Sequence, residues 1–246
     1  MGTMHDPAVA GLARVDLAAA FRLAVRLDLH EGVCNHFSLM LPDGSFLLNR
    51  YGLHWSEVTA ANLLALDAEG NLLAGQGEFE KTAFYIHSRL HLAHPRAACV
   101  LHTHMPYATA LTLLEGGRLE MVEQNALRFH GDIAYDDTYN GLVVDRAEGD
   151  RLALALGGKR VLFLANHGVI VVGPTVAEAF DLLYYLERAC RLQVLARSMG
   201  GKLRAVRPEV ARRTYDLMLA DAPAYAGAHF AALKRILDRE EPDYSR

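Results

Sequence analysis

Apolar residues occur in short runs along the first third of the chain, and turn residues separate the runs. Residues 36–50, HFSLMLPDGSFLLNR, contain two apolar stretches on either side of Asp43 and Gly44. This pair favours the positive backbone dihedral angles of a tight turn, so we predict a β-hairpin here. Residues 63–74, LLALDAEGNLLA, repeat the arrangement around the sequence EGN and predict a second pair of strands.

Longer helical and apolar segments follow in the rest of the chain. Residues 82–95, TAFYIHSRLHLAHP, have the length of a helix and end at a proline. Residues 97–104, AACVLHTH, predict a buried strand, and residues 160–173, RVLFLANHGVIVVG, predict two more on either side of NHG. Gly supplies the sharp turn between them. Two long helices are expected from about 175 to 199 and from about 208 to 237, with the sequence MGG between them.

The order of these elements predicts the fold class. Hairpins in the first half and mixed helices and strands elsewhere favour an α+β arrangement or a three-layer α/β/α sandwich around a mostly antiparallel sheet. The chain has 246 residues, of which 52% are hydrophobic and 22% charged, so it can bury a substantial core. Since there is no proline- or serine-rich linker, low-complexity tract or repeat, we expect one domain over residues 1–246.

Charge, hydropathy and cysteine usage narrow the partners and the compartment. The formal net charge is −4 and the Lys and Arg residues form no continuous run, so nucleic acid is not an expected partner. No stretch approaches the roughly 18 uninterrupted apolar residues of a membrane span. Charged residues interrupt the helical pattern of residues 1–27, which therefore lacks the apolar core of a signal peptide. Cys34, Cys99 and Cys190 have no CxxC spacing, and we expect reduced thiols in a cytoplasmic protein.

Two histidines in the strand at residues 97–104 are the first candidates for chemistry. Side chains in a strand alternate, so His102 and His104 point the same way and their rings can converge on one point. The pair indicates either a metal site or two hydrogen-bonded core residues. His167, between Asn166 and Gly168, is well placed to project into a cleft, or to hydrogen-bond within its own turn. Three imidazoles would suit zinc, manganese, iron or cobalt and leave coordination positions open.

The order of several motifs resembles that of the class II aldolase/adducin family over roughly residues 15–200. The motifs are CNHFS, YGLHWSEVTAANLLALDAEGN, AFYIHSRLHLAHPRAACVLHTHMPYATAL, EQNALRFHGDIAYDD and LANHGVIVVGPTVAEAF. The resemblance implies a three-layer α/β/α domain with a central antiparallel sheet, and a homotetramer with its site near a subunit interface. It also implies that His102, His104 and His167 bind a divalent metal, for which we expect zinc, with manganese or iron as alternatives.

One residue of the family's sugar-phosphate aldolases is replaced in this chain. Their metal polarises a carbonyl and a glutamate moves protons. That glutamate lies four residues before the histidine that is His87 here, so Ala83 takes its place. Alanine can neither ligate a metal nor transfer a proton. The departure argues against ordinary aldol cleavage unless Glu78, Glu80 or a group from a neighbouring subunit substitutes.

The phosphate pocket of the resembled enzymes is altered as well. A Ser-Gly pair and a Ser-Ser pair help to hold the phosphate there, and this chain has Tyr51-Gly52 and Lys81-Thr82 at the matching positions. Tyr51 favours a flat or aromatic small molecule, while Lys81 can still meet an anion. The family's Asn-x-x-Ser loop is retained. The candidate substrate-binding residues are therefore Asn35, Ser38, Tyr51, Gly52, Lys81 and Thr82.

Residues near EQNALRFH are candidates for proton transfer, because the resemblance places this segment near the site. His130 is the candidate acid or base, and Glu123 shares its location. His87 and His91 are four residues apart on a predicted helix, but HxxxH without the glutamate of zinc proteases favours a structural role. Tyr139 is expected to be a packing or turn residue.

Three classes of function fit these residues. The first is a metal-dependent carbon–carbon lyase, either an aldolase or a decarboxylase, acting on a small hydroxy, keto or aromatic acid by Lewis acid catalysis. Some relatives remove carboxylate from hydroxylated aromatic acids, a reaction that does not require the missing glutamate. The second is a non-haem iron oxygenase on the same scaffold. The third is a non-catalytic binding module that resembles the adducin head domain. The presence of the three histidines argues against this third class.

Overall fold

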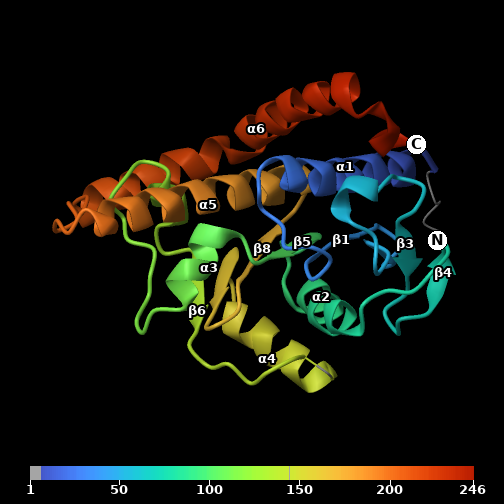
Figure 1. Cartoon of the computed structure of the whole chain (residues 1–246), viewed down its shortest axis with the longest axis horizontal. Helices are drawn as coiled ribbons and strands as arrows, with labels where there is room; N and C mark the ends of the chain where they lie inside the picture. The colour runs from blue at the N-terminus through green and yellow to red at the C-terminus, as the bar shows by residue number, and fades with distance from the viewer. Residues whose placement is uncertain (1–6, 144) are drawn as a thin grey trace.

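One eight-stranded sheet forms the centre of the molecule, with helices on both of its faces (Figure 1). The computed structural model describes residues 7–143 and 145–246. The strand order is β4-β3-β2-β1-β5-β8-β7-β6, and every neighbouring pair is antiparallel except β6 and β7. The strands are β1 (His36–Met40), β2 (Phe46–Leu48), β3 (Leu64–Leu66), β4 (Leu72–Ala74), β5 (Cys99–Thr103), β6 (Ile133–Asp136), β7 (Val161–Leu164) and β8 (Val169–Gly173).

The helices divide between the two faces of this sheet. In Figure 1, α1 and α5 lie on one side with α6 beyond them, while α2 and α4 lie on the opposite side. The helices are α1 (Pro7–Arg26), α2 (Lys81–Ala93), α3 (Pro106–Thr112), α4 (Arg146–Leu156), α5 (Val176–Ser198) and α6 (Pro208–Glu240). Short 3-10 helices are η1 (Trp55–Glu57), η2 (Ala126–Phe129) and η3 (Pro242–Ser245). The predicted three-layer α/β/α fold with a mostly antiparallel sheet is confirmed.

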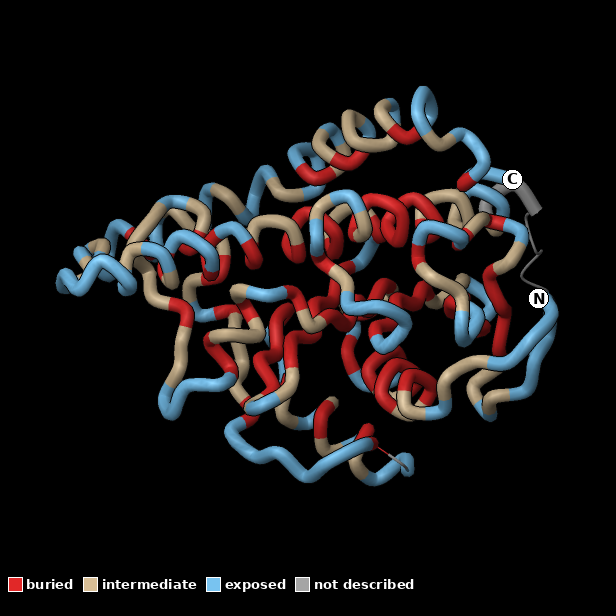
Figure 2. Tube along the Cα trace, in the orientation of Figure 1, coloured by how far each residue is buried: buried red, intermediate tan, exposed pale blue. Residues whose placement is uncertain are grey.

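Side chains of the central strands point alternately to the two faces of the sheet, so each face has its own hydrophobic core. In β5, Leu101 packs with residues of α1, α3 and α5, whereas Val100 packs with residues of α2 and α4. Because strand side chains point alternately to opposite faces, one buried strand contributes to both cores. The buried segments in Figure 2 follow this sandwich, with exposed residues along the outer faces of the helices.

The predicted turns and helix ends are largely confirmed. Gly44, with φ 85°, lies between β1 and β2, and β3 and β4 form the second antiparallel pair. The helices α5 and α6 are separated at Met199, as the MGG sequence indicates. The sequence pattern did not predict α3, α4 or β6, since short elements carry too few periodic positions to stand out.

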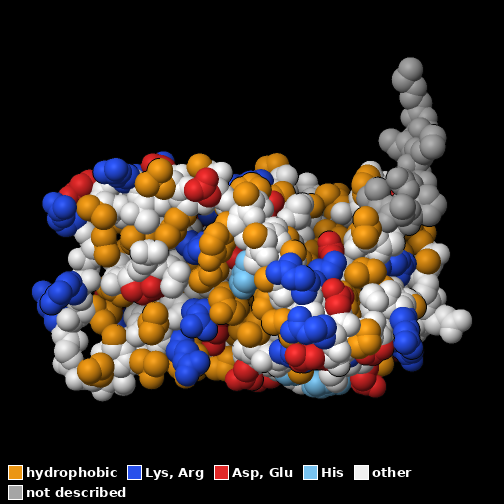
Figure 3. Space-filling model, turned by 90° about the horizontal axis from the view of Figure 1, so that it is seen from above, with side chains coloured by type: hydrophobic (Ala, Val, Ile, Leu, Met, Phe, Trp, Pro, Cys, Tyr) orange, Lys and Arg blue, Asp and Glu red, His pale blue; other side chains and the backbone are white. Residues whose placement is uncertain are grey.

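Charged side chains of both signs are mixed on one face of the molecule (Figure 3), and the three cysteines are unpaired. Figure 3 shows the face that carries α6, where Lys and Arg side chains are interspersed with acidic and hydrophobic ones and form no single stripe. No helix within residues 7–143 and 145–246 combines the length and apolar character that crossing a bilayer requires. The thiols of Cys34, Cys99 and Cys190 are all free.

Candidate metal centre

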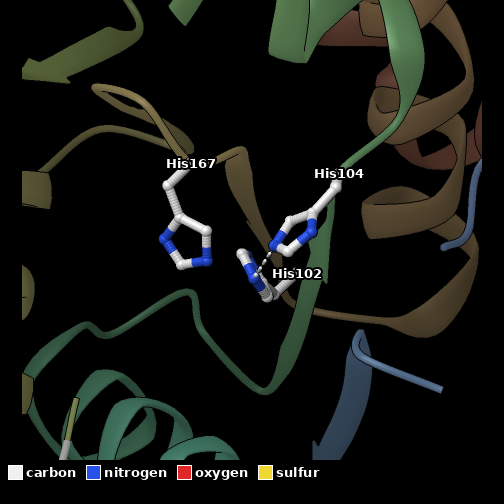
Figure 4. Close-up of side chains that lie close together, drawn as sticks. All are labelled: His102, His104 and His167. Atoms are coloured by element: carbon white, nitrogen blue, oxygen red, sulfur yellow. Dashed lines mark hydrogen bonds between the residues drawn. The ribbon is translucent and has the colours of Figure 1, made fainter. Parts of the chain in front are cut away.

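Three imidazole rings converge at the end of β5 and the turn between β7 and β8 (Figure 4). His102 lies within β5, His104 follows the strand, and both point to the same side, as strand alternation requires. His167 reaches them from the neighbouring turn. One ring nitrogen from each residue lies within 4.8 Å of the others, a separation that one metal ion can span.

The turn that carries His167 has two features that bring the ring to β5. Asn166 adopts a left-handed conformation with φ 56°, which asparagine tolerates better than most residues. Gly168, which we expected to supply the sharp turn, is not among the residues with a positive φ. A Cβ at Gly168 would lie 2.5 Å from the carbonyl oxygen of Thr103 and 2.7 Å from Cδ2 of His104. Glycine is therefore required here for close approach of the turn to β5.

Hydrogen bonds on the far sides of the rings determine their tautomers. Nδ1–H of His102 donates to the carbonyl oxygen of Val169 at 3.0 Å, and Nδ1–H of His104 donates to Oε2 of Glu31 at 2.5 Å. In the neutral rings, both Nε2 atoms are then unprotonated. These two atoms lie 3.1 Å apart, the contact dashed in Figure 4. Two lone pairs that face each other at this distance repel unless a cation lies between them, so the donor set fits a metal ion.

Burial keeps two of the candidate ligands, His102 and His167, neutral. The pKa of His102 is lowered well below its usual value, mainly by burial and then by the neighbouring histidines. Burial also lowers the pKa of His167 to about 4, with a further contribution from His104. Neutral imidazole is the form that coordinates a metal, so these rings can bind one at neutral pH without releasing a proton.

A pocket of about 360 Å³ opens beside the three histidines. Among the described residues, Glu80 is the only acidic side chain that lines it, and no lysine or arginine does. The remaining lining is His36, Val33, Cys34, Tyr51, Thr82, Ile86, Tyr139, Gly141, Leu142 and Val143. Flat and apolar side chains therefore dominate the walls away from the histidines.

Glu80 and Ala83 face different environments although they lie on the same turn of chain. Glu80 is the N-cap residue of α2, and its Oε1 accepts a hydrogen bond from the hydroxyl of Thr82. Ala83 is 1% exposed and packs in a separate apolar cluster with Phe46 and Phe84. A carboxylate is thus present in the pocket three residues before the position at which the sequence lacks one.

The predicted substrate-binding residues fall into three groups. Tyr51 and Thr82 line the pocket, whereas Gly52 and Lys81 do not. Asn35 is buried behind it, and its Oδ1 accepts hydrogen bonds from the backbone N–H groups of Glu31 and His104. Ser38 is completely buried, and its hydroxyl contacts two histidines of α2. The last two residues support the site from behind.

The predicted proton-transfer residues lie away from this pocket in the chain. His130 packs its ring against Tyr215 of α6, with ring centroids 6.5 Å apart. Both carboxylate oxygens of Glu123 accept backbone N–H groups, from Asn125 and Ala126, at the start of η2. Neither residue is among those that line the pocket. Their assignment stays a prediction without support from the geometry of this chain.

Three residues of the site were missed from the sequence. Glu31 orients His104, and Tyr139, expected only to pack or turn the chain, lines the pocket with its ring centroid 6.4 Å from that of His167. His36 lines the pocket beside His102, its Cα partner in the β1–β5 pairing. The available signal was strand register, since His36 and His102 become neighbours only if β1 pairs with β5 in this alignment.

The chain is similar over most of its length to proteins of one family. Residues 15–194 match the family described as "Class II Aldolase and Adducin N-terminal domain". An adducin-related protein of Schizosaccharomyces pombe is 31% identical over 247 residues, which cover 94% of this chain and 75% of that protein.

Solved structures share the fold. An aldolase II superfamily protein from Pseudomonas syringae has a TM-score of 0.89 and 34% identity, covering 96% of both chains. An L-fuculose 1-phosphate aldolase from Glaciozyma antarctica has a TM-score of 0.85 and 24% identity, covering 100% of this chain and 97% of that one. At 24% identity the second comparison speaks for the fold alone.

Proposed function

Because the chain belongs to the class II aldolase and adducin N-terminal domain family, we propose that it is a metal-dependent lyase that breaks a carbon–carbon bond in a small acid. The observation that carries the proposal is a carboxylate, Glu80, in the same pocket as three convergent imidazoles. A binding module without catalytic activity has no need of either feature. Zinc is the proposed ion, with manganese and iron as the alternatives to test.

The division of labour in the pocket follows from its side chains. His102, His104 and His167 would hold the ion, which when bound supplies Lewis acid polarisation of a substrate oxygen. Glu31 holds the ring of His104 so that its Nε2 faces the ion. Since three protein ligands leave coordination positions open, substrate oxygens have room to bind.

Glu80 is the proposed proton-transfer residue. Cleavage of a carbon–carbon bond leaves an electron pair on the retained fragment, and a proton that the general acid takes up from water must reach that carbon. Glu80 is the only carboxyl among the described residues that line the pocket, and the hydroxyl of Thr82 orients it. A positioned general acid or base contributes about 10²–10⁴-fold to rate. This assignment makes the missing glutamate at Ala83 compatible with lyase chemistry.

The walls of the pocket favour an aromatic or keto acid over a sugar phosphate. A phosphate in a protein pocket is typically met by lysine, arginine or a cluster of backbone N–H groups, and no described lysine or arginine lines this one. Tyr51, Tyr139 and Leu142 instead offer flat and apolar surface. We therefore propose decarboxylation of an ortho-hydroxy aromatic carboxylate, whose hydroxyl and carboxylate would be the oxygens presented to the site that the three histidines form.

A parallel assay tests this reaction. The protein is loaded with Zn²⁺, Mn²⁺ or Fe²⁺ and incubated with salicylate, 2,3-dihydroxybenzoate or fuculose 1-phosphate, with and without oxygen. Metal-dependent carbon dioxide release without oxygen uptake supports the proposal. Glu80→Gln should lose this activity while Glu78→Gln, whose residue does not line the pocket, keeps it. Aldehyde release from the sugar phosphate overturns the substrate assignment, and stoichiometric oxygen uptake with iron assigns the protein to the oxygenases.

The assembly and compartment remain proposals of the same kind. We propose a homotetramer that binds a small molecule in the cytoplasm, without nucleic acid or membrane partners. Large apolar side chains are exposed near the site, among them Leu142 at 78% and Tyr139 at 53%, and a second copy of the chain would cover such surface. Sedimentation at micromolar concentration distinguishes a tetramer from a monomer.

A further inference from the structure

A chain of hydrogen bonds runs from the pocket into the interior between β1 and α2. His36 and Ser38 point to the same face of β1, and His87 and His91 lie one turn apart on α2. The ring of His36 contacts that of His87 through Nδ1 and Nε2 at 2.7 Å. The hydroxyl of Ser38 contacts Nδ1 of His87 and, at 2.7 Å, Nε2 of His91. Nδ1 of His91 lies 2.5 Å from the carbonyl oxygen of Ala97.

The carbonyl at the inner end determines the direction of every bond in this chain. Since a carbonyl oxygen only accepts, Nδ1 of His91 carries the proton and its Nε2 is unprotonated. The hydroxyl of Ser38 must therefore donate to His91 and accept from Nδ1–H of His87. Nε2 of His87 is then the acceptor for Nδ1–H of His36. The last free atom is Nε2 of His36, which is left without a proton.

This reasoning requires neutral rings along the interior part of the chain. Burial lowers the pKa of His91 to about 4. Burial and the neighbouring imidazoles lower the pKa of His87 well below its usual value. Both rings are completely or almost completely enclosed, and neither has a carboxylate partner among the described residues that would favour a charged form. The neutral tautomers are therefore the ones present at neutral pH.

The unprotonated end of the chain faces the pocket. His36 is 4% exposed and lines the pocket with Glu80. Its Nε2 lies 3.8 Å from Oε2 of Glu80, too far for a hydrogen bond, and no other described residue donates to it. Both atoms are acceptors, so the space between them is suited to a donor. The ring of His36 also lies over that of His102, with centroids 4.8 Å apart, so this space adjoins the metal ligands.

We propose that Nε2 of His36 accepts a hydrogen bond from a substrate hydroxyl next to the group held at the three histidines. His87, Ser38 and His91 are positioning residues that hold His36 in the accepting tautomer. The site would then select acids that carry a further hydroxyl beside the metal-binding pair, a narrower class than hydroxy acids in general. The selectivity for such acids rests on the proposed function, whereas the tautomers set by the chain of hydrogen bonds do not depend on it.

Neutron diffraction reads the tautomers directly and independently of activity. Crystals of the metal-loaded protein, exchanged into D₂O, should show deuterium on Nδ1 of His36, His87 and His91 and on the Ser38 hydroxyl. They should show none on Nε2 of His36. Deuterium on that nitrogen, or the metal ion bound to it, overturns the proposal. The carbonyl of Ala97 imposes this direction whatever the chain does, so the neutron result tests the tautomer of His36 and the comparison of ligands tests its role.

A matched pair of ligands tests selectivity. Salicylate and 2,3-dihydroxybenzoate differ by one hydroxyl, and calorimetry on the zinc-loaded protein compares their affinities. One neutral hydrogen bond predicts about 2–10-fold tighter binding of the dihydroxy acid. The preference should vanish in His36→Phe, shrink in Ser38→Ala and persist in Thr109→Val, whose buried hydroxyl has no partner.

The outcomes separate this inference from the proposed function. An equal affinity for the two acids in the unmodified protein, or a preference retained in His36→Phe, overturns the selectivity. A preference that is lost in His36→Phe without any carbon dioxide release supports the role of His36 and refutes the lyase. If His36→Phe does not fold, the tautomers seen in the unmodified protein and the effect of Ser38→Ala still decide the question.

Discussion

The substitution Gly168→Ala should separate metal binding from folding at the candidate metal centre. The added Cβ would lie 2.5 Å from the carbonyl oxygen of Thr103, whereas ordinary van der Waals contact begins at 3.4 Å. The turn must therefore move away from β5 by roughly 0.9 Å, the difference between these two distances. His167 is the adjacent residue and moves with the turn.

The expected loss of affinity follows from coordination geometry. Metal–nitrogen distances in zinc sites are about 2.0–2.1 Å and tolerate only a few tenths of an ångström. A displacement of nearly 1 Å removes His167 from the coordination sphere. Loss of an outer-shell partner already lowers metal affinity by ~10–100-fold, so loss of a ligand should lower zinc affinity at least as much. The strain itself should lower the free energy of unfolding of the metal-free protein by about 1–3 kcal/mol.

Two measurements on the same variant check these expectations. Zinc affinity is measured by competition with a chromophoric chelator, and thermal unfolding is followed with EDTA and with excess zinc. In EDTA the midpoint should fall by about 2–4 °C for each kcal/mol lost. The added stability from zinc should shrink, because ligand binding stabilises the folded state by an amount that grows with the logarithm of affinity. Gly158→Ala, which meets no atom within 4 Å, is the control. A Gly168→Ala protein with zinc affinity within twofold of the unmodified protein refutes this account of the turn.

Five further predictions concern the ligands, the proton-transfer residue, burial of a carboxylate at position 83, pH and assembly. His167→Ala should lose bound metal and the stability that metal confers, while His130→Ala keeps both; full occupancy in His167→Ala, by elemental analysis, contradicts the ligand set. Glu80→Gln should lower kcat by about 10²–10⁴-fold at unchanged metal content. Ala83→Glu should lower the free energy of unfolding by at least about 1–3 kcal/mol in urea titrations, because it buries a carboxylate in an apolar cluster. Burial lowers the pKa of His91 from 6.5 to about 4 on folding, so this residue alone should cost the metal-free protein on the order of 3 kcal/mol of stability as pH drops from about 6.5 to 4, and nothing above that range. A urea midpoint independent of pH across this window would contradict the burial argument. Sedimentation should show a tetramer at micromolar concentration, and a monomer there would exclude a site built between subunits.

Local patterns were enough to predict the sheet, most of its strands and the convergence of two candidate metal ligands. The Asp43-Gly44 turn predicted the β1–β2 hairpin because backbone preference at a tight turn depends on the residues in it. His102 and His104 were predicted to converge because alternation along one strand is a local property. The resemblance to the family then added His167 to this pair, and the three residues do lie together in the structure.

Contacts between distant segments were beyond the reach of these patterns. Ala83 marked a missing carboxylate in the sequence, but only the packing of α2 against the sheet shows Ala83 in an apolar cluster and Glu80 in the pocket. His130 and Glu123 were chosen because their segment resembles one near the family's site, yet their side chains in this chain pack and cap elsewhere. Whether a side chain points into the pocket depends on tertiary packing, and the spacing of residues along the chain carries no information about that.

The sequence by itself indicated helices packed on a mostly antiparallel sheet, and the family resemblance narrowed this to three layers. The sequence also determined the paired histidines of β5, since their convergence follows from periodicity within a single strand. Tertiary structure alone decided that Gly168 allows close approach, that Glu80 lines the same pocket as the candidate metal ligands, and that His36 joins them there. The register of β1 against β5 places His36 beside His102, 66 positions further along the chain. Such neighbours arise from the simultaneous packing of strands and helices, because hydrogen-bond polarity and burial are properties of the assembled interior rather than of any one segment.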